Sequence, residues 1–205
     1  YFLDAARGMV ESGDWLVPRY RGEPFFDKPA LTYWLMAFAQ LWLGTTPGAA
    51  RIVPAASALL VLLATVWLGT LLYDRRTALA GGLVLATTFA FVTFGHVAMS
   101  DMLLALWSTL AVALAVRAAR PRPPAFLLPA LGAVLGLGFL TKGPIALLLP
   151  GIAIGLVFFR RRGKEPIRLQ LVPLGLGLLL FATLGLGWFA LLYRRLGPEP
   201  LLYFF

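Results

Sequence analysis

The sequence predicts an all-α, polytopic membrane protein, and three observations carry that prediction. Of its 205 residues, 60% are hydrophobic and only 13% are charged, which lies outside the usual balance of a soluble domain. The apolar residues gather in six segments, each near the length of about 20 residues with which a helix crosses the hydrocarbon core. Most lysines and arginines lie between these segments. We therefore expect about six transmembrane helices.

The six apolar segments follow one another with short connections. Their expected limits are 48–72, 77–98, 101–117, 125–141, 144–159 and 169–192. The fourth and fifth are shorter and are joined by the sequence LTKGP, where Gly143 and Pro144 break the helix and Lys142 resists burial. We expect these two segments to form a helical hairpin. Residues 48–192 would then be a transmembrane bundle, and 193–205 the start of the next outer segment.

The charged residues divide the loops into two sets. The loops 73–76, 118–124 and 160–168, together with Arg117 at the edge of the second, hold ten basic residues against two acids, whereas the remaining segments hold eight against seven. The positive-inside rule makes the first set cytoplasmic. Membrane topology thus accounts for the net charge of +9, and nucleic-acid binding is not expected. The second set carries most of the acids, so we expect a functional site on the outer face.

Residues 1–47 are expected to form an outer loop with structure of its own. Apolar residues from Phe2 to Val10 have helical spacing, and Gly13 stops that helix. A second helix is expected over PALTYWLMAFAQLWLG, which at about 14 residues is too short to span a bilayer and should lie along its surface. Residues 21–24, RGEP, have turn chemistry. The aromatic residues expected at the interface are Tyr33, Trp34 and Trp42.

Charged side chains on the outer face are the candidates for a site. Asp27 offers a ligand for a divalent metal or a hydroxyl, and Lys28 offers a contact for a lipid phosphate. Both also suit a solvated loop whose lysine reaches the headgroups. Asp101 begins a helix; it is a candidate general base, a ligand for an acceptor or a partner for Lys28, or else a carboxylate stabilised by the helix dipole.

Other polar residues carry weaker signals. Lys142 and Arg51 are further candidate phosphate contacts, but both also suit interfacial anchors. His96 is the single histidine, and its alternatives are a structural hydrogen bond or a role in chemistry. The arginines that we expect at headgroups or as flanking charges are Arg7, Arg19, Arg21, Arg194 and Arg195. The glycines that suit close helix packing are Gly132, Gly136 and Gly138.

Several classes of protein are excluded or disfavoured. The absence of cysteine excludes thiolate nucleophiles and disulfides. Walker, GxGxxG, HExxH and GxSxG motifs are absent. A transporter or flippase of lipid-linked sugars is an alternative to an enzyme, but charged residues inside the apolar segments, which a transporter would need, are missing. A purely structural membrane subunit is a third alternative.

Five stretches resemble one family of membrane enzymes. They are ARGMVESGDWLVPRYRGEPFFDKPALTYWL, ARIVPAASAL, YDRRTALAGGLVLATT, AMSDMLLALW and LGLGFLTKGPIALLLP. In this order they look like the bacterial membrane glycosyltransferases of the dolichyl-phosphate-mannose-protein mannosyltransferase type, and in particular like the branch that transfers aminoarabinose to lipid A. The resemblance implies a GT-C fold with a large first outer loop.

The resemblance also implies an activity and its partners. The donor would be a sugar on a polyprenyl phosphate, and the acceptor would be lipid A, a protein or another glycan. Transfer would invert the anomeric carbon, at the outer face of the bacterial inner membrane and among its lipids. A cofactor is not defined beyond a candidate divalent metal at Asp27.

Site residues follow from the resemblance position by position. Lys28 matches a lysine near the donor phosphate, Asp101 a second acid facing the cavity, and Lys142 the lysine of the TKG sequence. Asp27 matches an acid implicated in metal binding or loop ordering, and we group Tyr1 and His96 with it. The family's general base would precede Tyr1, so we expect this chain to be a piece of a longer protein that retains Asp101 as its catalytic acid.

Overall fold

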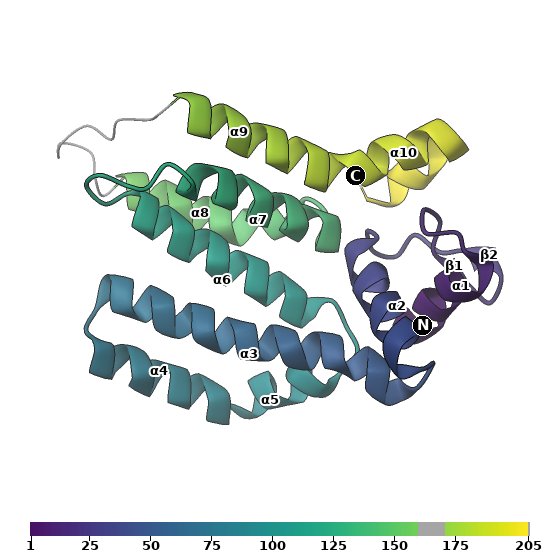
Figure 1. Cartoon of the computed structure of the whole chain (residues 1–205), viewed down its shortest axis with the longest axis horizontal. Helices are drawn as coiled ribbons and strands as arrows, with labels where there is room; N and C mark the ends of the chain where they lie inside the picture. The colour runs from purple at the N-terminus through teal and green to yellow at the C-terminus, as the bar shows by residue number, and fades with distance from the viewer. Residues whose placement is uncertain (160–170, 205) are drawn as a thin grey trace.

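A computed structural model describes residues 1–159 and 171–204 and is almost entirely helical (Figure 1). The predicted basic loop 160–168 lies outside the described residues. The elements are α1 Phe2–Ser12, β1 Arg19–Tyr20, β2 Glu23–Pro24, α2 Leu31–Leu43, α3 Pro47–Leu72, α4 Arg75–Thr87, α5 Phe89–His96, α6 Asp101–Ala118, α7 Leu127–Lys142, α8 Ile145–Phe159, α9 Leu171–Phe181, the π-helix η1 Ala182–Leu186, α10 Gly187–Leu196 and the 3₁₀-helix η2 Glu199–Tyr203.

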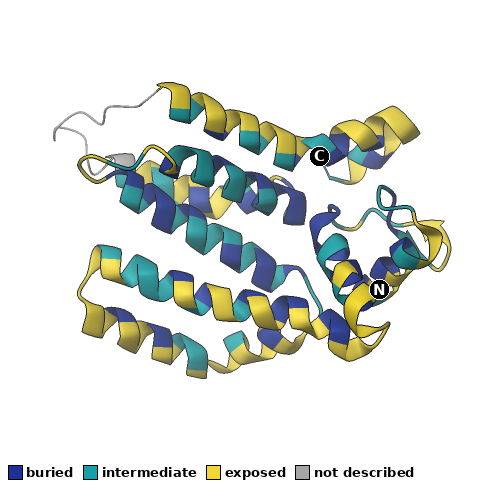
Figure 2. Cartoon of the chain, in the orientation of Figure 1, coloured by how far each residue is buried: buried dark blue, intermediate teal, exposed yellow. Residues whose placement is uncertain are grey.

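Two parts make up the molecule. The long helices lie side by side, while α1, α2 and the small hairpin form a separate layer at one end, near α10 (Figure 1). Large apolar side chains are exposed on the outer faces of α3, α4, α8 and α9, as the bundle helices in Figure 2 show. Such extensive apolar exposure is tolerated where lipid rather than water surrounds the helices. The expected all-α, polytopic membrane fold is therefore confirmed.

Each expected apolar segment falls on a helix. Among the described residues, α3, α6 and the continuous stretch Leu171–Leu196 are long and apolar enough to cross a membrane. The pair α4 and α5 makes a fourth span if it is counted as one, and α7 and α8 are apolar but shorter. The number of six crossings stays a prediction.

The segment expected at 77–98 is bent. α4 and α5 meet at 63° around Thr88, whose backbone is extended. The hydroxyl groups of Thr87 and Thr88 both donate to the carbonyl of Val84, at 3.1 and 2.8 Å. Threonine side chains that bond to nearby carbonyls compete with the helical ladder and bend helices. The apolar composition alone did not reveal this break.

A small hairpin interrupts the otherwise helical chain. β1 and β2 pair antiparallel, and Arg21 and Gly22 between them have φ angles of 53° and 87°. Two consecutive positive φ values are typical of the type I′ turn that joins such strands. The turn predicted at residues 21–24 is therefore present, with two residues of strand on each side that the sequence did not predict.

The core lies where the outer layer meets the bundle. One cluster packs Phe2 and Met9 of α1 against Tyr33 of α2 and Leu103 of α6. A second packs Leu31 of α2 against residues of α7 and α10. The outer loop is thus fastened to the helix ends by apolar burial.

The helix glycines make close packing, as predicted. A Cβ atom on Gly132 would lie 1.9 Å from the carbonyl oxygen of Gly177 on α9, and one on Gly136 would lie 3.2 Å from the amide nitrogen of Gly185. These glycines therefore let the backbones of α7 and the α9–η1 stretch touch.

Candidate functional site

The centre of the candidate site is an ion pair between two helix ends. Asp101 is the first residue of α6, and Lys142 is the last residue of α7, which packs beside it. Lys142 Nζ lies 2.8 Å from Asp101 Oδ1. The carboxylate lies at the N-terminal, positive end of the α6 dipole, and the ammonium lies at the C-terminal, negative end of the α7 dipole, so both positions are favourable. Of the alternatives for Asp101, pairing with Lys28 is not found, because the carboxylate of Asp101 contacts Lys142 and Lys28 contacts Asp27.

A glycine turn places Lys142 at the outer end of the bundle. Gly143 has a φ of 70° and donates its amide to the carbonyl of Phe139 over 2.7 Å, which closes α7. α8 begins two residues later, at Ile145. The predicted helical hairpin around LTKGP is therefore present, and its turn holds the ammonium beside Asp101.

The second charged pair lies in the outer loop. Lys28 Nζ lies 3.0 Å from Asp27 Oδ1 and donates to the Asp27 carbonyl over 2.9 Å. The side chains of Lys28 and Asp27 are 26% and 37% exposed. An ion pair of this exposure contributes little to stability. Lys28 can therefore exchange the Asp27 carboxylate for an incoming anion at a small cost in free energy.

Tyr1 connects the loop pair to the helix pair. Partial burial, followed by the negative charges of Asp27 and then Asp101, raises the pKa of the Tyr1 hydroxyl. Phe25, two residues before Asp27, packs against the core cluster that contains Leu103, two residues after Asp101, so the loop acid and the helix acid lie on neighbouring segments. The Tyr1 ring itself packs edge-on against Phe25, with centroids 5.6 Å apart.

Tyr33 belongs to this region, although the sequence suggested only an interfacial aromatic. Its side chain is fully buried, and burial, followed by the charge of Asp27, raises the pKa of its hydroxyl. The hydroxyl faces the backbone amide of Lys28 without reaching hydrogen-bond geometry. Only the fold reveals that Tyr33, five positions after Lys28, is buried in the core cluster between α1, α2 and α6. Trp42, in contrast, is 86% exposed, as an interfacial residue would be.

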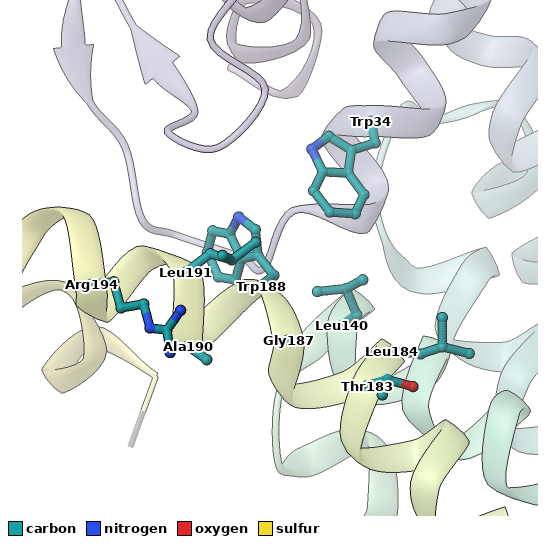
Figure 3. Close-up of a pocket in the computed structure, with 9 residues that line it drawn as sticks. All are labelled: Trp34, Leu140, Thr183, Leu184, Gly187, Trp188, Ala190, Leu191 and Arg194. Carbon is teal, nitrogen blue, oxygen red and sulfur yellow. The ribbon is translucent and has the colours of Figure 1, made fainter.

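An apolar groove lies between α2, α7 and the stretch formed by η1 and α10 (Figure 3). Its volume is about 510 Å³, and its lining residues are Trp34, Leu140, Thr183, Leu184, Gly187, Trp188, Ala190, Leu191 and Arg194. Leu140 lies two residues before Lys142, so the groove runs close to the ion pair. Arg194 lies toward one end of the groove, with Thr183 and Leu184 toward the other (Figure 3). The sequence placed Arg194 only as a flanking charge.

Three polar contacts hold the loop at residues 14–16 in place. The indole of Trp34 donates to the carbonyl of Trp15 over 2.7 Å, and that of Trp188 donates to the carbonyl of Leu16 over 2.9 Å. Arg195 pairs with Asp14 over 2.8 Å. The two tryptophans that line the groove are therefore fixed by the same loop.

The remaining candidates are engaged elsewhere or stand apart. His96 Nδ1 donates to the carbonyl of Val92 in its own helix over 2.7 Å, which is the structural alternative. Arg51 is exposed on α3, and its guanidinium makes no ion pair or side-chain hydrogen bond within the described part of the chain. The role of His96 as an acceptor contact and that of Arg51 as a phosphate contact stay predictions.

The other outer arginines have local partners. Arg7 pairs with Glu11 one turn along α1, at 3.3 Å. Arg19 donates to the carbonyl of Gly22 over 3.1 Å, and the Arg21 guanidinium lies 5.3 Å from the centre of the Tyr20 ring. The contacts of Arg19 and Arg21 stabilise the hairpin and that of Arg7 lies along α1, while contact of these arginines with lipid headgroups stays a prediction.

A metal centre in a protein needs several His, Cys, Asp or Glu side chains close together. Within residues 1–159 and 171–204, no three His, Cys, Asp or Glu side chains come together in a way that could hold an ion. The carboxylate of Asp27, the candidate metal ligand, contacts Lys28, and its role in metal binding stays a prediction.

Sequence relatives agree on one kind of protein. Residues 27–188 match the family described as dolichyl-phosphate-mannose-protein mannosyltransferase. A Pectobacterium carotovorum protein named undecaprenyl phosphate-alpha-4-amino-4-deoxy-L-arabinose arabinosyl transferase is 34% identical over 75% of this chain. A Sodalis glossinidius protein of the same name, numbered 1, is 34% identical over the full chain. The chain spans 28% and 37% of the length of these two relatives.

A solved structure has the same fold. ArnT from Cupriavidus metallidurans, crystallised with undecaprenyl phosphate, superposes on 99% of this chain with a TM-score of 0.86 and 25% identity. This chain corresponds to 38% of that protein. Fold, family match and relatives therefore agree, and the chain belongs to the dolichyl-phosphate-mannose-protein mannosyltransferase family.

Proposed function

We propose that the protein takes part in transferring a sugar from a polyprenyl phosphate to lipid A, at the outer face of the bacterial inner membrane. The observation that carries the proposal is that two ammonium–carboxylate pairs, Asp101–Lys142 and Asp27–Lys28, lie next to one core cluster, which contains Leu103 and against which Phe25 packs, at one end of an apolar bundle. The relatives are named for transfer of 4-amino-4-deoxy-L-arabinose from undecaprenyl phosphate, which suggests the same donor here.

The lysines are the proposed donor-phosphate contacts. Each ammonium now has a carboxylate partner and can exchange it for a phosphate oxygen of the donor. During transfer the bond between the anomeric carbon and the phosphate oxygen breaks, and the departing polyprenyl phosphate gains negative charge. Lys28 and Lys142 would stabilise that charge.

The acids are the proposed acceptor contacts. As the acceptor oxygen attacks the anomeric carbon from the opposite side, its proton must pass to a carboxylate, and the configuration inverts. Asp101 becomes available for the acceptor when the phosphate draws Lys142 away. Arg51, Asp27, His96 and Tyr1 are assigned to the edges of this site, with Asp27 and Tyr1 ordering the loop.

The apolar groove is the proposed seat of part of the donor's prenyl chain. Its walls are mostly leucine, alanine, glycine and the two fixed tryptophans, which suit an isoprenoid, and its polar lining residues are Thr183 and Arg194. Its position beside Leu140 would let a chain in the groove present its phosphate toward Lys142.

Charge distribution disfavours the transporter alternative. In α3 to α10 the charged residues lie in the first or last two turns of their helices, and none lies near a helix middle. A transport site at the bilayer midplane would need ionisable residues there, and the break between α4 and α5 at Thr88 carries none. The outer-face site is therefore the better supported one.

The test is sugar transfer by the whole protein in native membranes, with a labelled polyprenyl-phosphate donor. We expect Lys28→Gln, Lys142→Gln and Asp101→Asn each to lower turnover by about tenfold or more, since each removes a charge that meets the reacting groups. Asp74→Asn is the matched control, because Asp74 also begins a helix, at the opposite end of the bundle, and asparagine keeps its capping role. Normal turnover in Lys28→Gln and Asp101→Asn together would contradict the site.

A further inference from the structure

A hydrogen bond between Trp107 and Thr141 joins the same two helices as the Asp101–Lys142 pair. Trp107 Nε1 donates to Thr141 Oγ1 over 2.9 Å, from α6 to α7. Thr141 directly precedes Lys142, and Trp107 lies six residues after Asp101, or about 9 Å along the helix axis. The Trp107 indole therefore comes from deeper in the bundle and bonds to the last turn of α7, which carries the Lys142 ammonium.

Thr141 both accepts and donates a hydrogen bond through its hydroxyl group in this arrangement. Its side chain is completely buried, and while its oxygen accepts from Trp107 its own proton goes to the carbonyl of Leu137 over 2.7 Å. A hydroxyl that both donates and accepts is held in one rotamer. The last turn of α7 is thereby fixed relative to α6.

Trp107 is itself held in place. A Cβ atom on Gly138 would lie 3.3 Å from Trp107 Cβ, so the glycine of α7 makes room for the indole. The ring also packs against both core clusters that join the outer loop to the bundle. The donor of the hydrogen bond is therefore rigid, as a positioning group must be.

The bond lies at the end of the helix pair that carries the site. At the opposite end, α6 and α7 meet through the apolar residues Leu114, Ala118 and Leu127. Apolar contact is thus sufficient to pack these helices, whereas a buried polar bond requires defined geometry. Because the Trp107–Thr141 bond lies beside Lys142, we infer that it fixes the orientation of the last turn of α7 in addition to packing the two helices.

We propose that Trp107 and Thr141 are positioning residues that aim Lys142. The lysine side chain is 22% exposed and flexible, so the direction of its ammonium depends on a fixed backbone at the end of α7. With the Trp107–Thr141 bond in place, Lys142 reaches Asp101 in the free protein and the donor phosphate during transfer. This inference rests on the proposed function, which gives Lys142 its role.

The first test compares two threonine variants in the whole protein. Thr141→Val keeps the volume but removes the acceptor, and we expect kcat/KM for the donor to fall by about fivefold to tenfold. Thr141→Ser keeps the hydroxyl and should stay within about twofold of the parent. Thr87→Val is the matched control, because Thr87 also ends a helix but bonds only to carbonyls of its own helix, and it should be unchanged.

The second test asks whether Thr141 acts through Lys142. In a Lys142→Gln background, Thr141→Val should change kcat/KM by less than about twofold, since the group that it positions is already missing. A residue that only stabilises the fold would cause the same loss in both backgrounds. Equal losses, or a fully active Thr141→Val protein, would overturn the inference. Trp107→Phe, which removes only the N–H donor, checks the bond from its other side should Thr141→Val fail to accumulate.

The outcomes separate the two proposals. If Lys142→Gln alone turns over normally, Lys142 has no role, and the positioning inference is overturned together with this part of the proposed site. If Lys142→Gln is impaired while Thr141→Val and Trp107→Phe are fully active, the proposed function stands and only the positioning inference fails.

Discussion

At the scale of single residues, charge at the outer end of the bundle is neutralised in pairs. Lys142 meets Asp101, Lys28 meets Asp27 and Arg195 meets Asp14, at distances between 2.8 and 3.0 Å. The first two pairs are those that a phosphate could enter. The third joins two segments that are far apart in the sequence and therefore has a structural effect.

Asp14 predicts a dependence of stability on pH. Burial would raise the pKa of this carboxyl, but the hydrogen bond from Arg195 and those from the Val17 and Leu16 amides outweigh burial and lower it from its ordinary value of 3.8. The folded form therefore holds its proton less tightly than the unfolded form. The resulting stabilisation is fully present above about pH 4 and is lost as the pH falls through the lowered pKa.

Asp14→Asn should accordingly lower the melting temperature of the detergent-solubilised protein at pH 6. The difference from the parent should shrink as the pH falls below 4, where the parent carboxyl also becomes neutral. Glu11→Gln serves as the control, because Glu11 is 67% exposed in its pair with Arg7 and should have little effect at either pH. A melting-temperature difference that stays constant from pH 6 to pH 3 would contradict this account.

At the scale of elements, glycine decides how closely α7 and α9 approach. The sequence indicated close packing at Gly132, but the partner, Gly177, became visible only in the fold. A methyl group at Gly132 has no room, because the nearest atom is a backbone oxygen that cannot rotate away. The two helices would have to separate.

Gly132→Ala should therefore destabilise the protein by about 1–3 kcal/mol, the usual range for an overpacked interior. Thermal unfolding in detergent measures the effect. Gly151→Ala is the matched control: it also lies inside an apolar helix, but nothing lies within 4 Å of the added Cβ, so its better helix propensity should leave stability equal or higher. Equal melting temperatures for the two variants would show that α7 and α9 are not in close contact.

At the scale of the whole molecule, the outer loop is fastened to the far end of the chain. Trp188 on α10 donates to the carbonyl of Leu16, 172 residues away, and lies beside Phe189 in the second core cluster. The loop that bears Asp27 and Lys28 thus depends on contacts with the last described helices. Its position relative to Lys142 is a property of the complete fold.

Trp188→Phe should loosen this loop without unfolding the bundle. The ring packing is largely kept, but the N–H donor is lost and the Leu16 carbonyl is left without it, so hydrogen exchange at residues 14–20 should become faster by about fivefold to tenfold. Trp42→Phe is the control, since Trp42 is 86% exposed, and it should leave the exchange unchanged. Unchanged protection in Trp188→Phe would mean that apolar contacts alone hold the loop.

Much of this architecture is readable in the sequence because its causes are local. Helices in a bilayer must bury about 20 apolar residues and satisfy every backbone group internally, so composition predicts them directly. Helix ends at Gly13, Gly44 and Gly143 follow from the left-handed conformations that glycine adopts there. The charged residues of the candidate site were found for the same reason, since ionisable groups in an apolar chain stand out.

The tertiary structure alone decided which of these residues meet. It paired Asp101 with Lys142 rather than with Lys28, buried Tyr33 in the core cluster between α1, α2 and α6 and placed Arg194 at the groove. Such contacts depend on how helices from distant parts of the chain pack, and packing is set by side-chain shape, such as the gap that Gly138 leaves for Trp107. The sequence by itself therefore determined the membrane fold and which charged residues are available for the proposed site, whereas long-range packing decided which of them lie together.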